Sequence, residues 1–242
     1  LKGVLYDEQL RIGYYNIIGH AYWYYGDLPL LTQAAPKLVK YSVQLFNDHE
    51  TVCEEQKQAK LEMEQQINEG ANPADFESIE EPDIAAPTYA MATIGVAHTD
   101  LVIPHVDLFF KELCIHMADA TRFDEVELKC AQHCVTVLVN RFIARGVFGA
   151  SQLEESFSFI VEAMLTIPFN EIAYNCAHMF LNMKQVLGNE KWKLLSVSQL
   201  DKTILTQMKA CLAQVPFFNF TAKLSKFDTL IITSKSNCTA SY

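Results

Sequence analysis

Arginine is scarce in this chain of 242 residues, which contains only Arg11, Arg122, Arg141 and Arg145. Arginine is the side chain that most often contacts base edges and phosphates, so its scarcity argues against sequence-specific recognition of nucleic acid. The C-terminal part of the chain is instead rich in lysine with aromatic residues nearby, a combination that permits non-specific contact with a phosphate backbone. The candidate residues are Lys184, Lys191, Lys193, Lys223 and Lys226. The alternative is that these lysines simply lie on solvated helix faces.

Long apolar runs are also absent. The longest, such as residues 134–139, are far shorter than the roughly 20 residues that a membrane-spanning helix needs, so we expect no membrane span. The aromatic segment near the N-terminus carries Arg11 as its only basic residue, which argues against binding to a membrane surface. Because the chain begins with Leu1 and not with Met, we expect a fragment or a processed product.

Common catalytic motifs are missing as well. The sequence contains no GxxxxGK[ST], GxGxxG, GxSxG or HExxH pattern, which argues against phosphate-loop enzymes, the common dinucleotide enzymes, α/β-hydrolases and zincins. Glu112 and His116 have the helical spacing of an acid–base pair, as do Glu171, Asn175 and His178, but such pairs more often form surface hydrogen bonds. We therefore expect a protein that is not an enzyme, with no catalytic residue and no cofactor.

The seven cysteines are an odd number, and no CxxC pair occurs. Most lie in apolar segments, which is typical of reduced, buried thiols. This pattern predicts a cytoplasmic protein, or one within a virion if the chain is a coat protein. The best metal candidate combines Cys130, His133 and Cys134 on one helix face, with Cys114 and His116 as further ligands. The alternative is that all five are ordinary core residues.

The spacing of apolar residues predicts a mainly α protein, an irregular multi-helix bundle with one long projecting helix and an extended C-terminal tail. The first helix is expected over residues 7–25, before a stop signal at 26–29. A long second helix is expected to start near Pro36, since proline suits the first helical position, and to reach residue 70. Its half from residue 50 onward is highly charged and lacks a sustained heptad, so we expect it to project into solvent.

Four segments follow from this pattern: an aromatic-rich helix plus a long charged helix (1–70), an acidic proline-containing linker or loop (71–87), a compact helical core (88–216) and an extended tail (217–242). Within the core, helices are expected at about 104–119, 123–145, 169–187 and 199–214. A further helix should start at a capping box formed by Ser151 and Glu154 and end before Pro168.

The first helix carries six closely spaced aromatic residues: Tyr14, Tyr15, Tyr22, Trp23, Tyr24 and Tyr25. Neighbouring side chains point in different directions around a helix, so these rings cannot all face one core. We expect the surplus to contact another chain, together with Phe217, Phe218 and Phe220 of the tail.

Charge is unevenly distributed, with formal charges of −9 over residues 1–87, −6 over 88–183 and +5 over 184–242. The two ends could attract each other between copies, although uneven solvated surfaces are equally common.

Together these features predict a non-catalytic structural or assembly protein, a helical subunit of a homo-oligomer such as a coat, capsid or nucleocapsid shell. One alternative is a helical-bundle enzyme or small-ligand-binding protein, with polar groups from His20, Asp27 or His178. Another is a helical adaptor or scaffold that binds a partner helix.

Overall fold

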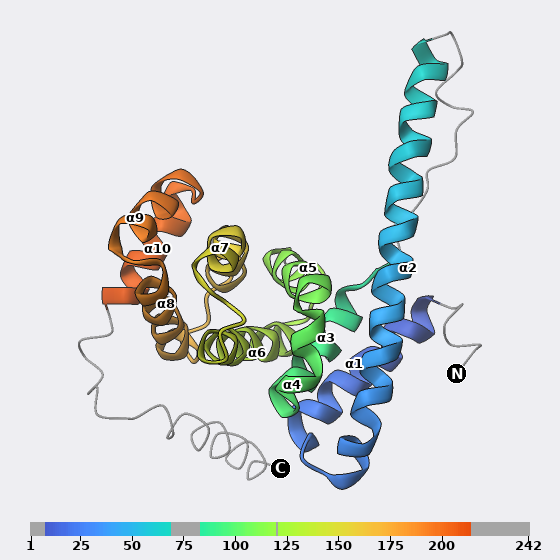
Figure 1. Cartoon of the computed structure of the whole chain (residues 1–242), viewed down its shortest axis with the longest axis horizontal. Helices are drawn as coiled ribbons and strands as arrows, with labels where there is room; N and C mark the ends of the chain where they lie inside the picture. Colours follow the sequence, from blue (N-terminus) through green and yellow to red (C-terminus); the bar gives the residue numbers. More distant parts are fainter. Residues whose placement is uncertain (1–7, 69–82, 120, 214–242) are drawn as a thin grey trace. The chain divides into compact units, whose positions relative to one another are not determined.

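The computed structural model describes residues 8–68, 83–119 and 121–213, and every regular element in these ranges is a helix. This confirms the prediction of a mainly α, multi-helix fold (Figure 1). The predicted tail over 217–242 lies outside the described residues, and with it Phe217, Phe218, Phe220, Lys223 and Lys226. The chain divides into two compact units, residues 1–134 and 135–242. Helix α6 (Glu125–Ala144) begins in the first unit and ends in the second.

Helix α3 (Ala85–Ala97) is the buried centre of the first unit. Every residue from Ala85 to Val96 is buried, and a helix without a polar face is typical of such a position. The other elements of this unit are α1 (Glu8–Tyr25), α2 (Pro29–Asn68), α4 (Thr99–Val102), the 3-10 turn η2 (Ile103–His105) and α5 (Val106–Ala118).

The contact between α1 and α3 is the most extensive helix contact of the described first unit, and two glycines lie in it. A Cβ atom added to Gly19 would lie 2.4 Å from Cε1 of Tyr89, and one added to Gly26, just after α1, would lie 2.6 Å from Cβ of Ala97. Gly19 thus lies against Tyr89, and Gly26, seven residues later, lies against Ala97, eight residues after Tyr89. Helices α1 and α3 therefore run in the same direction. Because a methyl group does not fit at either point, glycine is what permits this approach.

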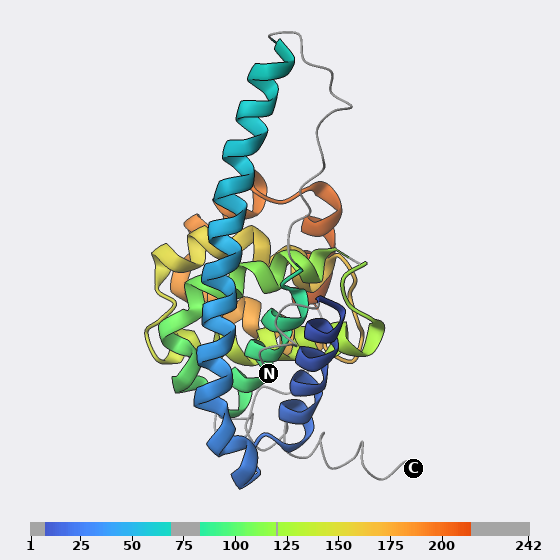
Figure 2. The ribbon, with the colours of Figure 1, turned by 90° about the vertical axis from the view of Figure 1, so that its right-hand side faces the viewer.

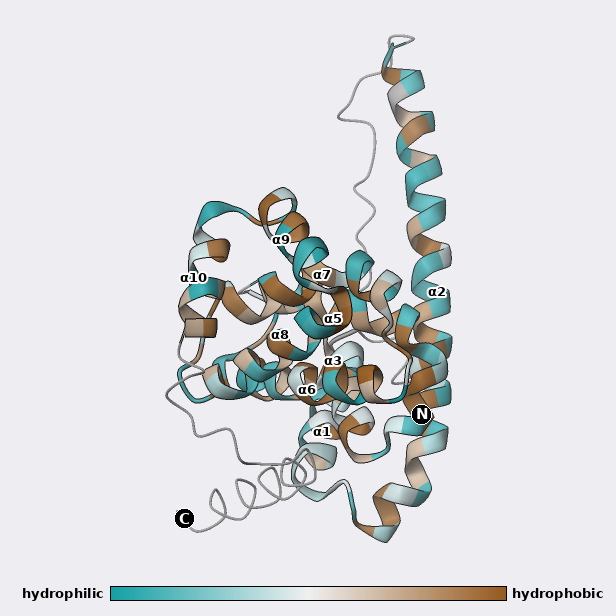
Figure 3. Ribbon diagram, turned by 60° about the vertical axis from the view of Figure 1, so that its left-hand side comes forward, coloured by the Kyte–Doolittle hydropathy of each residue, from teal (hydrophilic) through white to brown (hydrophobic). Residues whose placement is uncertain are grey.

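Helix α2 is the long projecting helix that the sequence predicts. Beyond about residue 50 it extends past the other described helices of the first unit (Figure 2), and this half is mostly hydrophilic (Figure 3). The predicted start near Pro36 is wrong, because Pro29 occupies the first helical position and Pro36 lies inside the helix. Pro36 is tolerated there because the Thr32 carbonyl, which loses its helical donor, belongs to an exposed residue that water can reach.

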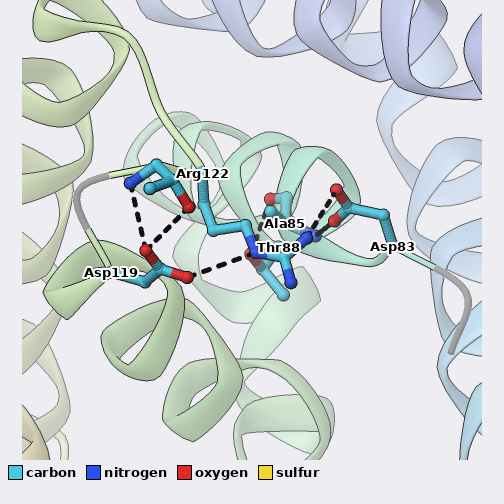
Figure 4. Close-up of polar contacts among 6 residues, drawn as sticks. Asp83, Ala85, Thr88, Asp119 and Arg122 are labelled. Carbon is cyan, nitrogen blue, oxygen red and sulfur yellow. Dashed lines mark hydrogen bonds and ion pairs between the residues drawn. The ribbon is translucent and has the colours of Figure 1, made fainter.

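A network of polar side chains fixes the start of α3 to the turn between α5 and α6 (Figure 4). One carboxylate oxygen of Asp83 accepts a hydrogen bond from the Ala85 N–H at 2.8 Å, and the other pairs with Arg122 at 3.3 Å. Arg122 also pairs with Asp119 at 3.4 Å. The backbone N–H and the hydroxyl of Thr121 donate to Asp119, and these bonds lower the pKa of that exposed carboxyl.

The second unit contains the end of α6 together with α7 (Ala150–Leu165), α8 (Ala173–Leu187), α9 (Asn189–Ser198) and α10 (Lys202–Ala213). Trp192 of α9 is buried against Phe157 and Phe180, with ring centroids 5.2 and 6.4 Å away. Helix α9 is short, with Trp192, Leu195 and Ser196 as its buried residues, and the sequence did not predict it. Gly188 ends α8 with a φ of 78°, which favours glycine, as the sequence predicts.

The capping box predicted at Ser151 and Glu154 is wrong by two residues. Helix α7 begins at Ala150, and the Gly149 N–H donates to the Gln152 side chain at 3.2 Å. Glu154 instead forms an ion pair with Lys191 of α9. The backbone of Gly149 is extended, with φ −87° and ψ −172°, as is usual for a residue that caps the start of a helix, and the Gln152 amide supplies the acceptor.

Candidate interaction surface

The six aromatic residues of α1 divide into buried and exposed groups. Tyr15 and Tyr22 are buried, and the Tyr22 hydroxyl donates to the Leu31 carbonyl at 2.6 Å. Burial raises the pKa of Tyr22 to about 12, since ionisation would place a charge where water is scarce. These two side chains therefore belong to the interior of the first unit and do not reach a partner.

The other four aromatic residues are partly or largely accessible. Tyr14 is half-buried with its ring edge against Tyr15, and Trp23 is half-buried beside the His133 ring, 5.9 Å away. Tyr24 and Tyr25 are exposed, at 41% and 57% of their surfaces. Only this last pair offers large aromatic surfaces that no described helix covers.

A row of uncharged side chains follows the accessible side of α1, and we call it the α1 stripe. On the helix it consists of Leu10, Tyr14, Ile17, Ala21 and Tyr24, at alternating spacings of four and three residues, and Leu28 in the turn after α1 continues it in sequence. Leu10, Ile17 and Leu28 are exposed by 58%, 71% and 52%, while Tyr14 and Ala21 are half-buried. Alternating steps of four and three place side chains along one side of a helix, the pattern with which helices pair.

The α1 stripe was only partly recognised from the sequence. Leu10, Ile17 and Tyr24 stand seven residues apart, and this spacing was the signal that could have revealed them. The aromatic residues indicate α1, but Leu10, Ile17 and Leu28 each expose a larger fraction of their surface than Tyr24 does. Leu30, at the start of α2, is a further exposed apolar residue, at 76% of its surface.

A second cluster, of polar groups, joins α1, α3 and α6 within the first unit. His20 lies 3.4 Å from the Tyr89 hydroxyl through Nδ1 and 3.9 Å from a Glu127 carboxylate oxygen through Nε2. Glu127 also accepts from the Asp124 N–H at 3.1 Å, while Asp124 accepts from the Glu127 N–H at 2.7 Å. This reciprocal pair is a capping box at the start of α6, so Glu127 has a structural role. Tyr89 is fully buried, and burial strongly raises its pKa, which disfavours a proton-transfer role.

The predicted metal ligands lie on α6 as expected, with Cys130 and Cys134 buried and His133 half-buried beside Trp23. Across the part of the chain that the structure describes, no group of three or more His, Cys, Asp or Glu side chains could hold a metal ion. Cys114 of α5 is fully buried, and burial raises the pKa of its thiol. A thiol of this kind stays protonated, which is unfavourable for metal binding.

The histidines of the two acid–base candidates are in partly apolar surroundings. Burial lowers the pKa of His116 below its ordinary value of 6.5, against opposing effects of Asp83 and Glu112. Burial likewise lowers the pKa of His178, whose ring contacts Tyr174 at 4.5 Å. The pKa of each histidine falls because a protonated ring is costly away from water. The packing of the helices around His116 and His178 accounts for this burial.

The lysines proposed for nucleic-acid contact differ in their surroundings. Lys191 forms an ion pair with Glu154, Lys184 is half-buried and Lys193 is exposed.

None of the helices in the described ranges is long and apolar enough to cross a membrane. Comparisons of the chain with protein-family models, with curated proteins and with solved structures found no match.

Proposed function

We propose that this chain is a non-catalytic structural subunit that assembles with copies of itself into a larger homo-oligomer, such as a coat, capsid or nucleocapsid shell. The observation that carries the proposal is the α1 stripe, an uncharged row of exposed side chains on a well-formed helix. Exposed apolar rows of this kind are unfavourable in water and usually mark contact with another protein.

The surrounding charge supports this choice of surface. Residues 1–87 carry a formal charge of −9, so two copies repel each other over most of this region. The α1 stripe contains no charged side chain, and contact there removes apolar area without burying an unpaired charge. It is therefore the part of the first unit where association costs least.

A shell needs at least two different contacts on each subunit, because a single two-fold contact closes after a dimer. The second unit offers one further apolar pair, Leu194 and Val197 on α9, which are 65% and 70% exposed. They are three residues apart and so share a helix face. We assign the second contact to this pair.

The free thiols support a reducing environment such as the cytoplasm or the interior of a virion. All six cysteines in the described residues are free, and Cys114, Cys130, Cys134, Cys176 and Cys211 are buried. Non-specific contact with nucleic acid through the lysine-rich C-terminal part is a subsidiary proposal, for which the exposed Lys193 is the available residue.

The test is the mass of the full chain in solution, measured by sedimentation velocity and light scattering across a wide concentration range. The wild-type chain is expected to form species well above its monomer mass of 27.4 kDa. Ile17→Asp should weaken association about 100-fold or more, because each copy would bury an unpaired carboxylate in the contact. Leu194→Asp should stop assembly at a small closed species.

Leu61→Asp is the matched control, since Leu61 is 61% exposed on the projecting half of α2 and outside both proposed contacts. It should assemble like the wild type. A wild-type chain that stays monomeric at every concentration would refute the proposed function, as would equal effects of Ile17→Asp and Leu61→Asp.

A further inference from the structure

The α1 stripe has a spacing that suits one partner in particular, namely the same helix of a second copy. Its five positions on α1 alternate by four and three residues from Leu10 to Tyr24, which is the a/d spacing of a two-helix seam. The stripe is nearly symmetric about the level of residue 19. Tyr14 and Tyr24 lie at equal distances on either side, as do Ile17 and Ala21, and in sequence Leu28 follows residue 19 by as many residues as Leu10 precedes it.

From this symmetry we infer that two copies of the chain pair through α1 in antiparallel orientation, around a two-fold axis at the level of residue 19. The inference rests on the proposed function, because it specifies the partner and the geometry of one of its contacts. In this register Tyr14 faces Tyr24 of the second copy and Ile17 faces Ala21, while Leu10 lies next to the turn that carries Leu28 of the second copy.

Side-chain size favours the antiparallel over the parallel pairing. A parallel pair would place Ala21 against Ala21 and Ile17 against Ile17, so that one layer is underfilled next to a crowded one. The antiparallel register gives two equal layers of isoleucine against alanine, and even filling of space is what close packing requires. Antiparallel helices also bring opposite ends of their dipoles together.

The groups that flank the stripe tolerate this arrangement. On one side the antiparallel register places His20 near His20 of the second copy, with Gly13 on the same flank. A Cβ atom added to Gly13 would meet nothing within 4 Å, so this flank leaves room for a second helix to approach. On the other side the exposed Tyr25 adds aromatic surface to the contact.

The area available is sufficient for a specific dimer. Taking on the order of 200 Å² for each fully exposed large side chain, the exposed parts of Leu10, Ile17, Tyr24 and Leu28 amount to about 450 Å² per copy, and Tyr25 and Leu30 raise the maximum to about 700 Å². Two copies then remove between about 900 and 1,400 Å² from water, which reaches the lower end of stable protein interfaces. A contact of this size is a concentration-dependent building block of an assembly.

Photo-crosslinking tests the inference. The photoreactive residue p-benzoylphenylalanine replaces Tyr24 in one variant and Leu10 in another, and the full chain is irradiated at a concentration at which it is assembled. The probe at position 24 should capture residues around Tyr14, and the probe at position 10 should capture residues around Leu28. A probe at Leu61 is the control and should capture no part of α1.

The expected cross-links cannot form within one helix. Positions 14 and 24 are about 15 Å apart along α1, and positions 10 and 28 are farther still, beyond the reach of a contact probe. Mixing chains of natural and heavy-isotope composition identifies the intermolecular products by mass. Both variants replace exposed side chains, and circular dichroism confirms that each keeps its helix content.

The outcomes separate the inference from the proposed function. Cross-links from position 24 to position 24, or from the stripe to another helix, would overturn the antiparallel pairing while the measured mass still supports assembly. A chain that is monomeric by sedimentation would overturn both. Cross-links between positions 24 and 14, and between 10 and 28, would establish the pairing.

Discussion

Replacing Gly19 by alanine tests the closest helix contact of the first unit, on which the orientation of the α1 stripe depends. The new Cβ atom would lie 2.4 Å from Cε1 of Tyr89, whereas ordinary contacts begin near 3.4 Å. The two helices must therefore separate by about 1 Å, or the fully buried Tyr89 ring must move within a packed core. Overpacking of this kind costs about 1–3 kcal/mol.

Helix propensity acts in the opposite direction, because alanine is favoured over glycine inside a helix by about 1 kcal/mol. For a clash near the upper end of the range, Gly19→Ala should lower the free energy of unfolding by about 2 kcal/mol. Gly13→Ala is the matched control in the same helix, where an added Cβ meets nothing within 4 Å. It should raise the free energy of unfolding by up to about 1 kcal/mol.

Urea denaturation of both variants at low protein concentration gives the comparison. In a Trp192→Phe background, Trp23 is the sole tryptophan and its fluorescence reports the first unit. The expected difference between Gly19→Ala and Gly13→Ala is about 3 kcal/mol. Tyr89→Leu should cost less stability in the Gly19→Ala background than in the wild type, since it removes the clashing ring. If Gly19→Ala proved as stable as Gly13→Ala, the close packing of α1 on α3 would be refuted.

Three further predictions concern single polar groups. Tyr22→Phe should lower the free energy of unfolding by about 1 kcal/mol, because the Leu31 carbonyl loses its hydrogen-bond donor. Urea denaturation measures this change, and an unchanged midpoint would contradict the hydrogen bond between Tyr22 and Leu31. Since burial holds the pKa of His116 below 6.5 in the folded chain, its contribution to stability is present above pH 6.5 and is lost as the pH falls through the folded pKa. Denaturation at decreasing pH should show a shallower loss for His116→Gln, and an equal loss would refute the assignment. Thr121→Val should raise the pKa of Asp119 toward 3.8, as measured by NMR titration of the carboxyl carbon, because one of the bonds that stabilise the ionised form is removed.

The helical fold was predictable from the sequence, but some boundaries were not. Pro29 and Pro36 both satisfy the rule for a first helical position, and local pattern gives no reason to prefer the earlier one. Helix α3 was missed because it is apolar on every side, so it has no helical periodicity to detect. Helix α9 was missed because Trp192 and Leu195 are its only large buried side chains, too few to establish a period.

The sequence indicates α1 as the location of the candidate surface, but it does not indicate which side chains of α1 are exposed. The excess of apolar side chains in the α1 sequence agrees with the exposure of Ile17 and Tyr24. It does not distinguish these from Tyr15 and Tyr22, because the side of α1 that α3 covers is set by contacts between residues far apart in the chain. Only the fold shows that the glycines at 19 and 26 mark the covered side.

The most direct measurement of the central claim is the solvent accessibility of the α1 stripe as the full chain is concentrated. Hydroxyl-radical or carbene labelling followed by mass spectrometry reports Leu10, Ile17 and Tyr24 individually, with Leu61 as the internal reference. Labelling of the three stripe residues should fall together as the measured mass rises, while labelling of Leu61 stays constant. Unchanged labelling of Ile17 and Tyr24 in a sample that has assembled would show that the contact lies elsewhere and would contradict the account.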